Sequence, residues 1–178
     1  MARGTSRGAP PRPVVDLTIV LDEHQVEQRK ATIAAKLEDL GDVSALDSPR
    51  ARRRRLIDLR AVAPGADLPA LALFQYREAF DRRAGSWRLI AYAYEFHDRI
   101  RGGRRAYHWH DDSFHAHCLE PDARGASHYR AVPMDVFEAH DEFARIYLGG
   151  GPIRCGDLRP ALAWADPIGK PVPVILSV

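Results

Sequence analysis

The residues best suited to chemistry are four histidines that lie within ten positions of the chain. They form two His-x-His pairs on either side of Asp111 and Asp112: His108 with His110, and His115 with His117. Side chains two positions apart in a β-strand point to the same face of the sheet. Each pair therefore presents both of its imidazoles on one side of a strand.

A tight turn between the two pairs would bring the four rings together. Two turns are compatible with the segment, a two-residue turn at Asp112-Ser113 or a four-residue loop over residues 111–114. Both give one register, in which His110 lies opposite His115 and His108 lies opposite His117, with Cβ atoms roughly 4.5–5.5 Å apart. The sequence thus predicts that all four imidazoles share one face, whereas a slip by one residue would separate them.

Two kinds of chemistry are compatible with such a face. As metal ligands, His108, His110, His115 and His117 would suit zinc, iron or manganese, and Asp111 or Asp112 would orient a ligand or act as a general base. Without a metal, one histidine would take a proton from a ribose 2′-hydroxyl and another would protonate the leaving oxygen, while Arg104 or Arg105 held the phosphate. A third interpretation is a solvated strand face without a chemical role.

The neighbours of the histidines depend on the turn that contains Gly102 and Gly103. One register places Tyr92 and Tyr94 beside the imidazoles, which favours stacking or a hydrogen-bonded phosphate. The other places Glu95 and His97 there, which favours a metal site or an acid–base site. The sequence leaves both registers open.

The elements that must carry these residues follow from periodicity and from helix caps. Strands are predicted over residues 14–21, 71–80, 87–97, 104–110 and 114–120. Helices are predicted over residues 22–40, over residues 48–59 after Ser48-Pro49, and over residues 133–148. The expected fold is α+β, with an antiparallel sheet of four or more strands, a following helix and an N-terminal helical pair.

The chain is expected to form one domain with two extensions. We expect a disordered basic tail over residues 1–13 and a single α+β domain over residues 14–148. Residues 149–178 are expected to form an extended Pro/Gly-rich segment packed on that domain. Arg52 to Arg55, placed on the second predicted helix, would form either a phosphate-binding patch for RNA or a solvated helix face. His24, His128 and His140 are isolated in the sequence and are assigned no role.

Composition narrows the class of protein. The 178 residues are 46% hydrophobic and 28% charged, as in a soluble globular protein, and the net charge of +2 does not itself indicate nucleic-acid binding. No apolar run approaches the ~20 residues that a bilayer span requires. The two cysteines, Cys118 and Cys155, do not suggest a disulfide framework, and Cys118 is expected to be a packed core thiol. A cytoplasmic protein is predicted.

Residues 71–148 resemble the TumE-type toxins of toxin–antitoxin systems. The matching elements are the tyrosine-containing segment at residues 87–94, Gly102-Gly103, His110-Asp111-Asp112, His115-Ala-His117 and the acidic, phenylalanine-containing segment at residues 135–143. The resemblance implies a growth-inhibiting toxin that acts on RNA or on translation and is neutralised by a cognate antitoxin.

Three functions are therefore predicted. The first is an RNA-cleaving toxin without a cofactor, with catalysis by the histidine face and its aspartates (His108, His110, Asp111, Asp112, His115 and His117) and substrate binding by Arg104, Arg105, Tyr92 and Tyr94. The alternative is a metal-dependent, cupin-like enzyme that acts on a small molecule. The third is a non-enzymatic interaction module that uses a sheet edge or the C-terminal prolines. The expected partners are RNA and an antitoxin protein, without a membrane, and a homo-oligomer is compatible with the sequence.

Overall fold

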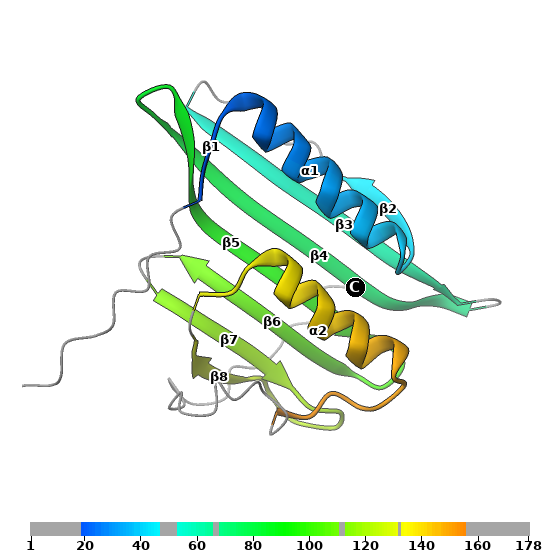
Figure 1. Cartoon of the computed structure of the whole chain (residues 1–178). Helices are drawn as coiled ribbons and strands as arrows, with labels where there is room; N and C mark the ends of the chain where they lie inside the picture. The colour runs from blue at the N-terminus through cyan, green and yellow to red at the C-terminus, as the bar shows by residue number, and fades with distance from the viewer. Residues whose placement is uncertain (1–18, 47–52, 66–67, 111–112, 132, 156–178) are drawn as a thin grey trace, which may run out of the picture.

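The computed structural model describes residues 19–46, 53–65, 68–110, 113–131 and 133–155. Within these residues, one antiparallel sheet of eight strands carries two helices (Figure 1). The elements in chain order are β1 (Val20–Leu21), α1 (Glu23–Glu38), β2 (Asp42–Ala45), β3 (Arg54–Gly65), β4 (Leu68–Arg83), β5 (Ser86–Asp98), β6 (Gly103–His110), β7 (Ser113–Leu119), β8 (Ser127–Arg130) and α2 (Val136–Leu148).

Neighbours in the sheet are also neighbours in the chain. The strand order is β2-β3-β4-β5-β6-β7-β8, and β1 pairs with the first residues of β5. Short turns join the long central strands. The turn between β4 and β5 contains Ala84 and Gly85, and the turn between β5 and β6 contains Gly102, all three with positive φ angles. Gly102, with φ of 77°, occupies the left-handed region that glycine enters without steric cost.

Both helices begin at a capping box and pack on the same face of the sheet (Figure 1). The Asp22 carboxylate accepts a hydrogen bond from the Gln25 backbone N–H, and the Gln25 side chain accepts one from the Asp22 backbone, both at 2.8 Å. Asp135 caps α2 in the same manner. These contacts satisfy backbone donors that the first helical turn leaves free. The predicted helices at residues 22–40 and 133–148 are confirmed.

Aromatic side chains form the core between the helices and the sheet. They occupy alternate positions on adjacent strands, and all are buried: Phe74 and Tyr76 on β4, Tyr94 and Phe96 on β5, and Tyr107 on β6. The Phe74 and Phe96 rings stack at 4.9 Å between centroids. Because alternate residues point to opposite faces, the residues between these aromatics face away from the helices.

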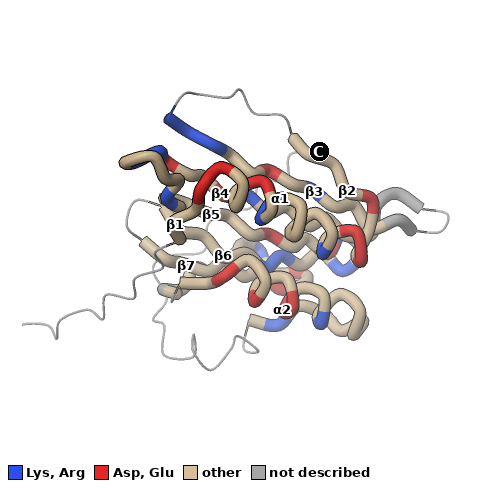
Figure 2. The backbone as a smooth tube through the Cα atoms, turned by 45° about the horizontal axis from the view of Figure 1, so that its top comes forward, with Lys and Arg blue, Asp and Glu red and all other residues tan. Residues whose placement is uncertain are grey.

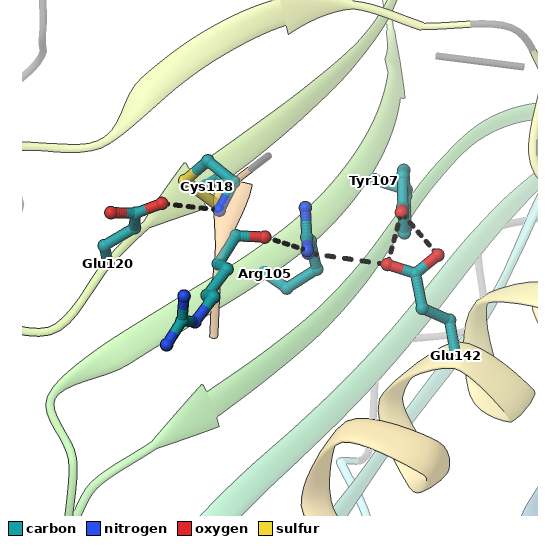
Figure 3. Close-up of a disulfide and its surroundings, with 7 residues drawn as sticks. Arg105, Tyr107, Cys118, Glu120 and Glu142 are labelled. Carbon is teal, nitrogen blue, oxygen red and sulfur yellow. Dashed lines mark hydrogen bonds and ion pairs between the residues drawn. A yellow bond between two sulfur atoms is a disulfide. The ribbon is translucent and has the colours of Figure 1, made fainter. Parts of the chain in front are cut away.

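Two buried carboxylates tie the helices to the sheet. Arg29 of α1 donates two hydrogen bonds of 2.7 Å to Glu78 of β4, which also accepts one of 2.6 Å from the Tyr94 hydroxyl. Glu142 of α2 accepts hydrogen bonds from the Tyr107 hydroxyl at 2.8 Å (Figure 3). Buried charges require such partners, because a carboxylate without them would lose its hydration without compensation.

A disulfide fastens the end of the described chain to the sheet. Cys118 of β7 is bonded to Cys155, whose backbone N–H donates to Glu120 at 2.7 Å (Figure 3). Arg105 is buried on the neighbouring strand β6, and its guanidinium donates a hydrogen bond of 2.9 Å to the Arg154 carbonyl. The expectation that Cys118 is a free core thiol is therefore wrong.

The predicted fold, an N-terminal helical pair with a sheet of four or more strands, is also wrong, because the described residues form eight strands and two helices, with a single helix before β2. The second predicted helix, at residues 48–59, is largely replaced by β3 from Arg54 onward, while residues 47–52 lie outside the described part. The strand buries Ile57, Leu59, Ala61 and Ala63 at two-residue spacing. A period of two residues is that of a strand with one buried face. The sheet, and not a second helix, therefore provides the apolar surface on which α1 packs.

The arginines that were predicted on that helix are distributed differently. Arg52 lies outside the described residues, Arg53 lies in a turn, and Arg54 and Arg55 begin β3. Arg55 forms an ion pair with Glu23 and lies over the Trp87 ring. Along the described chain, acidic and basic residues are interspersed over the helices and strands (Figure 2).

Several expectations fall outside the described residues. These are the tail at residues 1–13, most of the strand at residues 14–21, and the C-terminal segment beyond Cys155. Of the predicted C-terminal extension, residues 149–155 are described, and Ile153 within them is buried. Neither described helix has the length and apolar character needed to cross a membrane.

The disulfide is expected to contribute substantially to stability, because it closes a loop between residues 37 positions apart. We expect the Cys118→Ala/Cys155→Ala variant to lose about 2–4 kcal/mol of unfolding free energy in urea denaturation. Reduction of the wild-type protein should give a similar loss and should leave the double variant unaffected. Equal stability of oxidised wild type and double variant would contradict this assignment.

Candidate metal centre

The histidine pairs lie on the sheet face opposite the two described helices. On β5, Tyr94 points into the core between helices and sheet, so Glu95 beside it points to the other face. On β6, buried Tyr107 alternates with His108 in the same way. Burial of the aromatic side chains on one face of the sheet therefore determines that the histidines and Glu95 lie on the other face.

The hairpin that carries the histidines differs in register from the prediction. His108 pairs with His115, and His110 pairs with Ser113. The predicted partners, His110 with His115 and His108 with His117, are wrong by two residues. Because the side-chain period is two, this shift changes the partners and leaves the face unchanged. Asp111 and Asp112 themselves lie outside the described residues.

The four predicted imidazoles do converge on one face. Ring centroids are 4.6 Å apart for His108 and His117, 4.7 Å for His110 and His115, and 5.0 Å for His115 and His117. His110 is the exposed member of the group, at the end of β6. The expectation of a shared imidazole surface is confirmed.

A fifth histidine, His128 of β8, joins this surface. Its ring lies 4.0 Å from that of His117, its cross-strand partner. The sequence interpretation missed it because β8 is a four-residue strand that was not predicted. The only available signal was the alternation of His128 and Arg130 around Tyr129, which is short for a strand assignment.

Three of these histidines can coordinate a single ion. His108, His115 and His117 each offer a ring nitrogen, and these nitrogens all lie within 4.8 Å of one another. Nε2 of His117 is buried and has no hydrogen-bond partner among the described residues. A buried nitrogen without a partner is costly unless something else binds it, so this atom fits the role of a metal ligand.

Glu95 organises the cluster from β5. Its carboxylate contacts Nε2 of His108 at 3.1 Å and Nε2 of His97 at 3.0 Å, and it accepts a hydrogen bond from Arg104 at 2.8 Å. Burial opposes ionisation, but the bonds to the two histidines and the charge of Arg104 outweigh it and hold the pKa of Glu95 well below its usual range. Because Nε2 of His108 faces this carboxylate, its Nδ1 is left to act as a ligand.

Two of the candidate ligands are held neutral. Burial, followed by the neighbouring histidines His108 and His110, lowers the pKa of His115 from 6.5 to about 4. Burial, followed by His108 and His128, lowers the pKa of His117 from 6.5 to about 3. At pH 7 both rings therefore carry the free electron pair that metal coordination requires.

The structure settles which residues border the histidines. Glu95 and His97 lie beside them, and Arg104 lies on the same face. Tyr92 and Tyr94 lie on the helix face, where Tyr92 accepts a hydrogen bond from the Met134 backbone. Arg105 also lies there, only 1% exposed and next to Glu142 (Figure 3). Three of the four predicted substrate-binding residues are thus separated from the histidines by the sheet.

The neutral state of these rings is directly measurable. In metal-free protein, nitrogen-detected NMR titration should give pKa values of about 4 for His115 and about 3 for His117. The chain unfolded in urea should show histidines near the reference value of about 6.5. Midpoints close to that reference in the folded protein would contradict the burial and mutual repulsion described here.

The lowered pKa values of His115 and His117 also make the stability of the fold depend on pH. Below pH 6.5 these histidines become protonated in the unfolded chain, whereas in the folded protein they stay neutral to lower pH. The free energy of unfolding of metal-free protein should therefore fall as pH decreases from 7 toward 4, by at most about 1.4 kcal/mol per pH unit for each histidine. Urea denaturation at successive pH values measures this slope, and the His115→Gln/His117→Gln variant should show a shallower one.

Comparison with known proteins adds no further constraint on this site. No protein-family model, curated protein or solved structure matches the chain. The resemblance to TumE-type toxins thus stays a prediction from the quoted motifs. The chemistry of the centre has to be inferred from its own geometry.

Proposed function

We propose that the chain is a metal-dependent enzyme that acts on a small molecule and that its divalent ion is held by His108, His115 and His117. The observation that carries this proposal is the approach of three ring nitrogens to within 4.8 Å of one another, with Nε2 of His117 buried and unpartnered among the described residues. Neutral imidazoles in this number favour zinc or a similar transition metal over magnesium or calcium.

The ligand count favours catalysis over a purely structural ion. Structural zinc sites are usually closed by four protein ligands, whereas catalytic sites use three and leave a position open. An ion held in this way supplies Lewis-acid chemistry, by polarising a bound oxygen or lowering the pKa of a bound water. His110, exposed and 4.7 Å from His115 between ring centroids, is the ring placed to exchange a proton with a bound molecule.

Glu95 has the role of a positioning residue in this centre. Its contact with Nε2 of His108 fixes the orientation of that ring and leaves Nδ1 as the nitrogen that can bind an ion. A carboxylate behind a ligating histidine also increases the basicity of the ring. The contacts of Glu95 with His97 and Arg104 hold the carboxylate in place.

The RNA-cleaving toxin stays a prediction with less support. Arg104 lies where a phosphate-binding arginine is required, but Arg105 is buried on the other face. The mechanism also needs one protonated histidine as general acid, and the pKa values of His115 and His117 are lowered to about 4 and about 3. The RNA and antitoxin partners, a homo-oligomer and the interaction module also stay predictions.

The cytoplasmic location is a further prediction. Disulfides are rare in cytosolic proteins because thiol reductants keep cysteines reduced. The Cys118–Cys155 disulfide therefore argues against location in a reducing compartment. Counting free thiols in protein isolated from its native compartment under alkylating conditions would decide the matter.

Metal binding tests the proposal. Protein purified without a histidine tag and stripped with a chelator should bind zinc at one equivalent, measured by competition with a coloured chelator. We expect Glu95→Gln to weaken binding by about 10–100-fold and His117→Ala, which removes a ligand, to weaken it further. His24→Ala, an exposed histidine of α1, serves as the matched control and should bind like wild type. Unchanged zinc affinity in His117→Ala would contradict the proposed centre.

Activity in the presence of a chelator separates the two enzyme hypotheses. RNA cleavage that persists in excess chelator and disappears in His115→Ala would favour the metal-free toxin. Turnover that is abolished by the chelator and restored by zinc, iron or manganese would favour the metal-dependent enzyme. Circular dichroism of each variant would show that the loss of activity does not come from unfolding.

A further inference from the structure

Arg104 lies at the border of the proposed metal centre. It belongs to β6 and shares the histidine face, because it is two positions from Ala106 and four from His108. Ala106 pairs with His117 across the β6–β7 ladder, so Arg104 and His117 are diagonal cross-strand neighbours. The Arg104 guanidinium is thus held beside a candidate ligand.

The guanidinium of Arg104 is only partly used by the protein. One terminal nitrogen donates to Glu95 at 2.8 Å, whereas Nε is buried and has no partner among the described residues. The side chain is 17% exposed. A buried donor on a cationic group is costly to leave unpaired, and a planar guanidinium suits the two oxygens of a carboxylate or phosphate.

The charge balance of the site points in the same direction. The charges of Arg104 and Glu95 cancel in their ion pair, and a histidine that coordinates a metal does so as the neutral ring. A divalent ion on the three histidines would therefore leave this group of side chains with a net charge of about +2, counted from the formal charges. Such a site attracts anions and repels cations.

We propose that the open side of the centre binds the carboxylate or phosphate group of a small substrate, with one oxygen toward the metal and another toward Arg104. This inference rests on the proposed metal centre and adds the chemical class of its substrate. Arg104 is then a substrate-binding residue, and Glu95 holds it in place while also orienting His108. The two functions of Glu95 connect anion recognition to metal coordination.

Cobalt-substituted protein provides the test, because the visible spectrum of Co²⁺ reports on its ligands. The loaded protein is titrated separately with acetate, with inorganic phosphate and with acetamide, the uncharged analogue of acetate. We expect acetate or phosphate to shift the spectrum at concentrations at which acetamide does not. The tighter of the two anions identifies the class of oxyanion.

Variants of Arg104 distinguish anion binding from a structural role. Arg104→Gln should weaken anion binding by about tenfold or more, as expected for loss of a charge-assisted hydrogen bond, while Co²⁺ affinity changes much less. Arg104→Lys keeps the charge without the planar fork and should be intermediate. Arg77→Gln is the matched control, since Arg77 is an arginine of β4 that pairs with Asp58 instead.

The outcomes are separable from those of the metal proposal. Co²⁺ binding without any anion effect, or equal anion affinity in wild type and Arg104→Gln, would overturn the substrate class and leave the metal centre standing. A parallel loss of Co²⁺ and anion affinity in Arg104→Gln would show that the arginine only supports Glu95, which also overturns the inference. Failure of wild type to bind Co²⁺ would overturn both proposals.

Discussion

The strict two-residue alternation of side chains along the central strands is the constraint on which the rest of the structure depends. Tyr94 and Glu95 are adjacent in β5, yet one is buried under the helices and the other organises the histidines on the opposite face. A slip of one residue would bury Glu95 among aromatic rings and would place Tyr94 among the imidazoles. The apolar packing of one face therefore positions the polar chemistry of the other.

The two faces use carboxylates for different purposes. On the helix face, Glu78 and Glu142 are enclosed by donors from the helices and the sheet, so their charges are compensated and they fix helix positions. On the other face, Glu95 remains about one-fifth exposed and contacts three groups that surround a candidate ion site. Glu78 and Glu142 thus stabilise the fold. Glu95 instead orients candidate metal ligands and leaves one nitrogen of the Arg104 guanidinium available.

The parts of this structure that could be predicted from sequence are those determined by local signals. Helical periodicity marked both helices, and the His-x-His spacing placed the imidazoles on one face even though the register was wrong by two. β3 was mistaken for a helix because Ser48-Pro49 resembles a helix start and because Leu56 and Leu59 fit a helical period, whereas Ile57 and Leu59 fit the period of a strand. Burial against α1 decides between them, and burial is a tertiary property.

Other features had no decisive local signal. The Cys118–Cys155 bond and the approach of His128 to His117 both depend on how distant segments meet. Whether Glu95 or Tyr94 borders the histidines depends on the register between two strands, and a shift of one residue in the turn that joins them changes it. That turn contains two glycines, and both registers were sterically acceptable. Only the pairing of β5 with β6 resolves it, and that pairing is fixed by the aromatic core.

X-ray absorption spectroscopy of the zinc-loaded protein would identify the ligands of the ion, because it counts the atoms that surround it. We expect three imidazole nitrogens at about 2.0–2.1 Å, completed by a light atom from solvent or a bound anion. The His117→Ala protein, if it retains zinc at all, should show one imidazole fewer. A wild-type spectrum without imidazole ligands, or one unchanged by the loss of His117, would contradict the assignment of this face as a metal centre.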